Sequence, residues 1–209
     1  RGQTLRPEDH IAASREFGPL AIHVMAEQLL PGHPEILLVT NRQENGRYIG
    51  IPDLGRGWHT DTSYTEEPAM ASLLYALETP SDGSGHTQFA DTTAAHDALP
   101  HDMQRRIAGL KAEHIYEHDH EHFSPSDAQR KTLKGAIHPI VRTHPDTGQR
   151  ALYLGPIMTK RVVGMEVAEG QALLDELHAH ALAPAFVHTH EWRDGDLLIW
   201  DNRCTLHRA

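Results

Sequence analysis

The order of the expected strands limits the fold more than any other feature of this chain. Short apolar runs rich in β-forming residues are separated by turns, and helical patterns do not alternate with them. Successive parallel strands need a crossover of about a dozen residues, usually a helix, so this order argues against a doubly wound parallel sheet. The chain shows no repeat, low-complexity tract or linker. We therefore expect one mainly β domain, an antiparallel sandwich or jelly roll with flanking helices.

Capping residues, turns and apolar periodicity predict the individual elements. Pro7 suits the first turn of a helix, Asp91 is a good N-cap, and the apolar stripe of residues 166–182 predicts a helix packed on the core. Two β-rich segments that flank one turn are expected to pair as a hairpin. The expected helices are 5–17, 91–99, 100–109 and 166–182; the expected hairpins join 70–77 to 86–90, 137–143 to 150–154 and 185–192 to 197–200; a further buried strand is expected at 35–40.

Charge and cysteine content narrow the classes of partner. The formal net charge is −10 without a basic stripe, which argues against a nucleic acid. No apolar run approaches the roughly 20 residues of a membrane helix, so no membrane partner is expected. The single cysteine, Cys204, rules out an intrachain disulfide and fits a reducing, cytoplasmic location. Formation of a homo-oligomer stays open, and so does a targeting segment, because the sequence begins at Arg1 rather than Met.

Two histidines and one aspartate carry the metal-binding hypothesis. His59 and Asp61 are two residues apart, and on an extended chain such side chains project from the same face. Both can then reach one metal ion, and His207, at the end of Trp200-Asp-Asn-Arg-Cys-Thr-Leu-His207, is the best candidate for a third ligand. Two histidines and one carboxylate on one side of a metal leave its other positions open, as in non-haem Fe(II) oxygenases.

The spacing of His59 and Asp61 is not informative by itself. With 18 histidines and 29 acidic residues, such triplets arise by chance, and the chain also contains His33-Pro-Glu35 and His144-Pro-Asp146. Those two have a central proline within turn-like sequence, so we interpret them as turns. The triplet His59-Thr60-Asp61 instead follows a glycine-rich approach over residues 50–57. Its context favours it as the metal-binding triplet.

A histidine-rich run over residues 113–122 is a weaker candidate for a metal site. His118, His120 and His122 alternate there, but acidic residues alternate with them, and a Ser-Pro-Ser-Asp sequence follows. We interpret the run as a solvated, mobile loop.

Four blocks of sequence occur in a fixed order along the chain: Gly57-Trp-His-Thr-Asp-Thr-Ser-Tyr64, Ser84-Gly-His-Thr-Gln-Phe-Ala-Asp91, His138-Pro-Ile-Val-Arg-Thr-His-Pro145 and Trp200-Asp-Asn-Arg-Cys-Thr-Leu-His-Arg208. Together they resemble the taurine dioxygenase / 2,4-dichlorophenoxyacetate dioxygenase family of Fe(II)- and 2-oxoglutarate-dependent oxygenases. The resemblance covers essentially the whole chain. It implies a double-stranded β-helix, or jelly roll, in which His59, Asp61 and His207 hold catalytic Fe(II).

The resemblance also implies roles for two further residues. Thr87 matches a family threonine that hydrogen-bonds a carboxylate of the cosubstrate 2-oxoglutarate; an ordinary strand threonine is the alternative. His23 matches a histidine that approaches the acidic group of the substrate, and a role without substrate contact stays open. The implied reaction uses O₂ to hydroxylate a small anionic substrate such as an aryloxyalkanoate, sulfonate or alkyl sulfate. Hydroxylation beside an oxygen or sulfur gives an unstable product, so the net result is cleavage.

The chain departs from the family at both ends. Members have an N-terminal portion before the segment that begins here at Arg1, and a strand after the third ligand whose arginine binds the distal carboxylate of 2-oxoglutarate. No residue matches that arginine, and Arg208 and Arg142 are candidates to replace it. We therefore expect residues 1–209 to form a single oxygenase domain without those two parts. The alternative is a non-catalytic metal-binding jelly-roll protein with a structural or ligand-sensing function.

Overall fold

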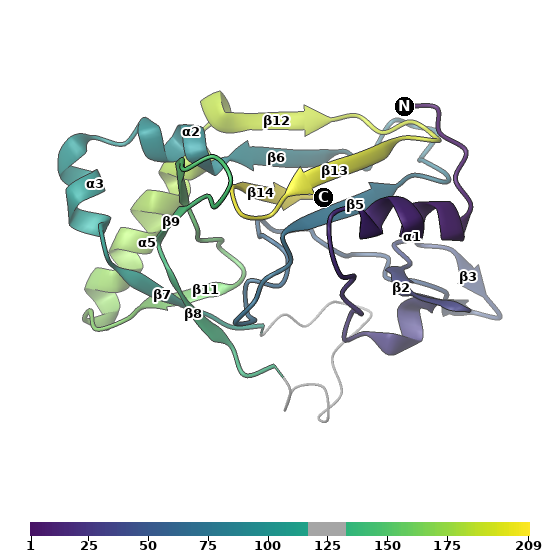
Figure 1. Ribbon diagram of the computed structural model, residues 1–209, viewed down its shortest axis with the longest axis horizontal. Helices are drawn as coiled ribbons and strands as arrows, with labels where there is room; N and C mark the ends of the chain where they lie inside the picture. Colours follow the sequence, from purple (N-terminus) through teal and green to yellow (C-terminus); the bar gives the residue numbers. More distant parts are fainter. Residues whose placement is uncertain (117–132) are drawn as a thin grey trace.

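The computed structural model describes residues 1–116 and 133–209 (Figure 1). The histidines His118, His120 and His122 lie outside the described residues. The helices are α1 (Pro7–Arg15), α2 (Thr92–Asp97), α3 (His101–Ile107) and α5 (Val167–Ala181), with 3₁₀ turns η1 (Ala26–Gln28) and η2 (Pro184–Phe186). The strands are β1 (Leu29–Leu30), β2 (His33–Leu37), β3 (Gln43–Glu44), β4 (Arg47–Tyr48), β5 (Ala71–Tyr75), β6 (Thr87–Asp91), β7 (Lys111–His114), β8 (Ala136–Pro139), β9 (Val141–Thr143), β10 (Arg150–Leu152), β11 (Thr159–Val162), β12 (Val187–His190), β13 (Leu197–Asp201) and β14 (Thr205–Arg208).

Every strand pairing within the described residues is antiparallel, so the expectation of a mainly β, antiparallel protein is confirmed. The sheets have the orders β12-β6-β14, β13-β5, β11-β7-β8 and β10-β9, with two small pairs, β1-β2 and β3-β4. In Figure 1 the strands β12, β6, β13 and β5 run across the upper part of the molecule, above β7, β8 and β11. The helices α3 and α5 lie at the left edge, and α1 lies at the right.

Two of the three expected hairpins are wrong. The segments around β5 and β6 flank a turn, but β5 pairs with β13 and β6 pairs with β12 and β14. The same correction applies to β12 and β13, which flank the turn at Gly195 without pairing. A turn sequence reverses the chain, but the choice of strand partner depends on apolar faces far away in the sequence. Only β9 and β10 form the expected hairpin, while the residues of β8 pair with β7.

The expected helices form where local signals placed them. Pro7 occupies the first turn of α1, and the carboxylate of Asp91 accepts hydrogen bonds from the first backbone N–H groups of α2 at 2.9 and 3.0 Å. Glu166 caps α5 in the same way. His178 of α5 has a buried Nε2 atom although it lies outside the apolar stripe of that helix. Within the described residues, no helix is both long and apolar enough to cross a membrane.

Two interpretations of polar segments are wrong in part. His33 and Glu35 lie in strand β2 rather than in a turn. There His33 lies 3.5 Å from Glu8 of α1, and Glu35 lies 3.0 Å from Arg15 of the same helix. The strand expected at 35–40 thus begins at His33, and its residues are mostly half-buried rather than buried. The run 113–122 begins as the end of β7, and its His114 is fully buried rather than part of a solvated loop. In both places, contacts with elements distant in sequence override the local polar composition.

Two apolar clusters hold the sheets and helices together. The larger one joins α2, α3 and α5 to β7, β9, β10 and β11. The smaller one contains Met25, Ile51, Tyr64, Tyr116 and Met158 and lies beside the segment that carries His59 and Asp61. The larger cluster consists of Ala95, Leu99, Ile107, Ala112, Ile140, Leu152, Leu154, Val162, Leu173, Leu174, Leu177 and Ala181.

The burial of α5 generates a stability prediction. Leu174 is 1% exposed within the larger cluster, whereas Val167, at the start of the same helix, is 77% exposed. We expect Leu174→Ala to lower the free energy of unfolding by about 2–5 kcal/mol, because it removes buried methyl groups and leaves a cavity. The control Val167→Ala should change it by less than about 0.5 kcal/mol. Chemical denaturation measures both, and equal effects would contradict the packing described here.

Candidate metal centre

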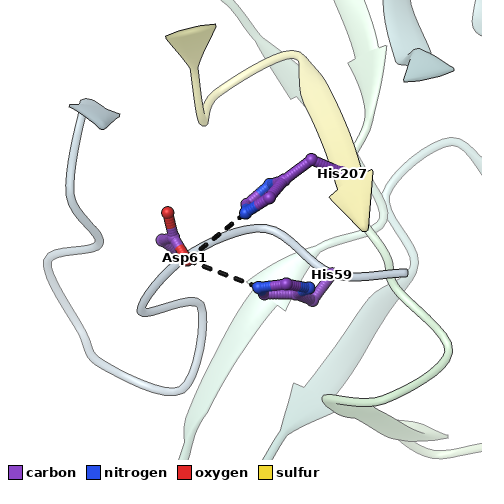
Figure 2. A group of neighbouring side chains, drawn as sticks. All are labelled: His59, Asp61 and His207. Atoms are coloured by element: carbon purple, nitrogen blue, oxygen red, sulfur yellow. Dashed lines mark ion pairs between the residues drawn. The ribbon is translucent and has the colours of Figure 1, made fainter. Parts of the chain in front are cut away.

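Three side chains expected to meet do come together. His207 of β14 and His59 form an antiparallel bridge, with backbone N–H···O distances of 3.0 and 2.8 Å. Asp61 follows two residues after His59, and Figure 2 shows its carboxylate facing both imidazole rings. One carboxylate oxygen, Oδ1, lies 3.5 Å from Nε2 of His59 and 3.6 Å from Nε2 of His207. One ligand atom from each residue thus lies within 4.8 Å of the other two.

Glycines allow the backbone to approach closely at this point. A Cβ atom at Gly155 would lie 3.2 Å from the Cα of His59, and one at Gly57 would lie 2.5 Å from Cδ1 of Ile157. A side chain at Gly155 would therefore crowd the backbone of His59, and one at Gly57 would displace the side chain of Ile157. After Asp61, Thr62 has a φ of 53° and the chain turns away from the bridge. His59 is β-paired and Asp61 is not, yet both side chains point to the same side, as the period of two predicts.

The remaining polar atoms of the three residues fix their orientation. Nδ1 of His59 lies 2.8 Å from the carbonyl oxygen of Gly57, which can only accept, so Nδ1 carries the proton and Nε2 offers its lone pair. The other carboxylate oxygen of Asp61, Oδ2, accepts a hydrogen bond of 2.5 Å from Ser72. Nδ1 of His207 is buried and has no hydrogen-bond partner among the described residues.

Electrostatics favour an ionised Asp61 and a neutral His207 at this centre. Burial acts to raise the pKa of Asp61, but His207 and His59 outweigh it and hold that pKa well below its usual range. Burial lowers the pKa of His207 to about 4, against the opposing effect of Asp61. For His59 burial is again the largest influence, but the carboxylate of Asp61 and the backbone contacts raise its pKa overall. A carboxylate and two imidazole lone pairs form a donor set that fits a divalent transition metal.

In a second group of possible ligands, two of the three residues already use their ligand atoms in other contacts. His144, Asp201 and Cys204 also approach one another within 4.8 Å. However, Nε2 of His144 donates to Asp201 at 3.0 Å, and its Nδ1 accepts two backbone N–H groups of the following turn. Arg203 binds Asp201 at 2.6 Å and, despite burial, helps to lower its pKa to about 2. Asp201 and Arg203 therefore form a structural ion pair, and the expected turn at His144 is anchored by a buried ring.

Thr87 lies near the centre on the same face of the sheet. His207 pairs with Phe89, and side chains alternate along β6, so Thr87, Phe89 and His207 share a face. The hydroxyl oxygen of Thr87 accepts a hydrogen bond of 2.8 Å from the indole of Trp192. Its own proton is then free for another acceptor. Trp192 was not predicted from the sequence, where its only signal is its position in the strand segment 185–192.

His23 lies in the segment before η1, and its Nδ1 accepts a hydrogen bond of 3.3 Å from the backbone of Met25. Val24 and Met25, which follow it, belong to the smaller apolar cluster that also contains Tyr64, three residues after Asp61. Its expected role in substrate binding stays a prediction.

The two arginines considered as replacements for the family's carboxylate-binding arginine have other contacts. Arg208 donates to Gln88 at 2.7 Å and lies over the ring of Trp58 at 5.0 Å. Gln88 alternates with Thr87 on β6, so Arg208 lies on the opposite face of the sheet from Thr87 and cannot share a carboxylate with it. The guanidinium of Arg142 lies 4.4 Å from the ring centroid of Tyr153.

Comparisons with known proteins are consistent with this centre. The chain matches the model of the "Taurine catabolism dioxygenase TauD, TfdA family" over residues 1–209. It is 37% identical to an alpha-ketoglutarate-dependent 2,4-dichlorophenoxyacetate dioxygenase of Cupriavidus pinatubonensis, over 100% of this chain and 77% of that protein.

Solved structures are similar too. A taurine dioxygenase from Burkholderia xenovorans has a TM-score of 0.81 and 32% identity, over 100% of this chain and 66% of that one. The structure of AAD-2 in complex with Mn(II) and N-oxalylglycine has a TM-score of 0.75 and 31% identity. The match covers 99% of this chain and 72% of AAD-2. These neighbours support the mainly β fold.

The geometry predicts that His59, Asp61 and His207 bind the metal. His59→Ala, Asp61→Ala and His207→Ala should each weaken Mn(II) or Fe(II) binding by more than about 100-fold, because loss of an outer-shell partner alone costs about 10–100-fold. The matched control is His33→Ala. His33 also lies two residues before an acidic residue, Glu35, but it belongs to β2. Calorimetry and metal analysis measure the result. A loss in His33→Ala equal to that in His59→Ala would refute the assignment.

Proposed function

The chain belongs to the taurine catabolism dioxygenase TauD, TfdA family, and we propose that it hydroxylates a small anionic substrate with Fe(II), 2-oxoglutarate and O₂. Its relatives are named as alpha-ketoglutarate-dependent dioxygenases, so the enzymatic interpretation is confirmed over a non-catalytic metal-binding protein. The observation that carries the proposal is the convergence of His59, Asp61 and His207 on one point. We further propose a double-stranded β-helix, or jelly roll, which the antiparallel sheets support.

His59, Asp61 and His207 would hold Fe(II) through two Nε2 atoms and one carboxylate oxygen. When bound, iron supplies the Lewis acidity and redox chemistry by which O₂ and 2-oxoglutarate oxidise a C–H bond. The rings of Trp200 and Phe89 pack against His207 at centroid distances of 4.8 and 6.1 Å. They exclude water from that side and fix the orientation of the imidazole.

Thr87 is the proposed contact for a carboxylate of 2-oxoglutarate. Trp192 donates to its oxygen, so the hydroxyl proton is directed away from the indole and can be donated to an anion. Thr87 is 8% exposed, and a hydrogen bond to a carboxylate is worth more in such a dry environment. His23 is the proposed contact for the acidic group of the substrate.

The proposed substrates are aryloxyalkanoates, sulfonates and alkyl sulfates. One relative is named for an aryloxyalkanoate, 2,4-dichlorophenoxyacetate, and another for sulfate esters. Replacement of hydrogen by hydroxyl on the carbon beside the ether or ester oxygen gives a hemiacetal-like product. That product expels the oxygen substituent as an alcohol, a phenol or sulfate and leaves a carbonyl, so hydroxylation leads to cleavage.

The proposal predicts a spectroscopic and a chemical signal. Anaerobic addition of Fe(II) and then 2-oxoglutarate should produce a visible metal-to-ligand charge-transfer band. Admission of O₂ with an aryloxyacetate should then release succinate and the phenol. The variant His59→Ala should give neither signal. Tight metal binding by the unaltered chain without a band on addition of 2-oxoglutarate would refute the dioxygenase function.

A second prediction concerns Thr87. Thr87→Val keeps the shape but removes a hydrogen bond to a charged group, which costs roughly 1.5–3 kcal/mol. The dissociation constant for 2-oxoglutarate, read from the charge-transfer band, should therefore rise about 10- to 150-fold while metal affinity is retained. The control is Thr189→Val, since Thr189 pairs with Gln88 and lies on the opposite face. An unchanged 2-oxoglutarate affinity in Thr87→Val would make Thr87 an ordinary strand residue.

A further inference from the structure

A chain of three hydrogen bonds leads from the indole of Trp200 to the carboxylate of Asp61. Nε1 of Trp200 donates to Oδ1 of Asn202 at 3.1 Å, and Nδ2 of Asn202 donates to Oγ of Ser72 at 2.8 Å. Ser72 in turn donates to Oδ2 of Asp61 at 2.5 Å. Trp200 and Ser72 are direct partners across β13 and β5, so the sheet register holds both ends of this relay.

The direction of each bond follows from the indole. An indole nitrogen donates but cannot accept, so the amide atom of Asn202 that faces Trp200 must be the oxygen. The amide nitrogen then faces Ser72 and donates to it. A serine hydroxyl has one proton, and the only acceptor left for it in this relay is Oδ2 of Asp61. The orientation of Ser72 is therefore fixed by Asn202 and Trp200, and neither of them offers a ligand atom to the centre.

Asn202 is held in place by burial and by backbone hydrogen bonds, so it can fix the orientation of Ser72. Its side chain is buried, with 1% of the residue exposed. Its backbone N–H donates to Met70 at 2.9 Å, and its carbonyl accepts the hydroxyl of Thr60 at 2.7 Å. Thr60 lies between His59 and Asp61 in sequence, so Asn202 also holds the segment that carries two of the proposed ligands.

The relay gives the two oxygens of Asp61 different surroundings. Oδ1 faces the Nε2 atoms of both imidazoles, whereas Oδ2 is bound to Ser72. A carboxylate that binds a metal through both oxygens takes one more coordination position than a carboxylate that binds through one. A 2-oxo acid and O₂ need the positions that the three protein ligands leave open.

We propose that Ser72, oriented by Asn202, is a positioning residue that keeps Asp61 bound to the metal through Oδ1 alone and so preserves the open side of the centre. This inference rests on the proposed function, because it concerns the same metal and the same 2-oxo acid. It assigns Ser72 no contact with either of them. Ser72 affects only the number of coordination positions on the metal that remain for the cosubstrate.

The test separates metal affinity from 2-oxoglutarate affinity. Calorimetry with Mn(II) gives the metal affinity. Anaerobic titration of the Fe(II)-loaded chain with 2-oxoglutarate gives the affinity for the cosubstrate. Ser72→Ala should keep metal affinity within about threefold or tighten it, while the dissociation constant for 2-oxoglutarate rises at least about tenfold. Ser72→Thr, which retains the hydroxyl, should restore 2-oxoglutarate binding.

The matched control is Ser63→Ala. Ser63 is 1% exposed and two residues from Asp61, and its hydroxyl has no hydrogen-bond partner among the described residues. This variant should bind the metal and 2-oxoglutarate as the unaltered chain does. An unchanged 2-oxoglutarate affinity in Ser72→Ala would overturn the inference. Parallel losses of metal affinity and thermal stability would also overturn it, because they indicate a purely structural role.

A metal-bound crystal structure of the unaltered chain provides an outcome that does not depend on any variant folding. A bond between the metal and Oδ2 of Asp61 would overturn the inference, and a bond to Oδ1 alone would support it. Failure of the proposed function is distinguishable, because the unaltered chain itself would then lack the charge-transfer band.

Discussion

The bridge between His59 and His207 is the interaction on which the centre depends. Two backbone hydrogen bonds join a segment with little regular structure to β14, and a third, from Ala209 to Gly55, extends the contact. Each bond fixes a distance between parts of the chain that are far apart in the sequence. Gly155 permits the bridge, since any side chain there would meet the backbone of His59. The bridge thus positions the backbone of both histidines, while the contact of His59 with Gly57 and the packing of Trp200 on His207 orient the two rings.

The partly buried carboxylate of Asp61 needs compensation for its negative charge, and the surrounding residues provide it. Burial of an ionised carboxylate is unfavourable unless charges or hydrogen bonds compensate it. Asp61 obtains that compensation from the two imidazoles and from Ser72. The hydrogen bond from Ser72 occupies only one carboxylate oxygen, so the compensation does not use up the donor atom that faces the imidazoles. Compensation of the charge of Asp61 and availability of its ligand atom are therefore compatible.

Local signals in the sequence predicted local structure well. The cap at Asp91 and the apolar stripe of α5 depend on residues within one or two turns, and both are confirmed. Strand partners were predicted poorly, because β5 and β13 recognise each other through faces that no nearby residue specifies. The convergence of the two histidines and the aspartate was predicted from four ordered blocks. Ser72 was missed because a single serine in a strand has no signature until its cross-strand partner is known.

The segment from Trp200 to Arg203 shows why neighbouring polar residues are not interchangeable. Asp201 faces His144 and Arg203, two donors, so a carboxylate satisfies both, and a neutral amide would leave the guanidinium with only the exposed Asp146 as a counter-charge. Asn202 lies between a donor, Trp200, and an acceptor, Ser72, so it must both accept and donate. A carboxylate at position 202 could accept from the indole but could not donate to Ser72. The serine proton would then have two acceptors to choose from, and a negative charge at the buried position 202 would lie close to that of Asp61. The two neighbouring residues thus need different side chains. Asp201 must be charged because it completes an ion pair, and Asn202 must be an amide because it accepts from the indole of Trp200 and donates to Ser72, which in turn donates to Asp61.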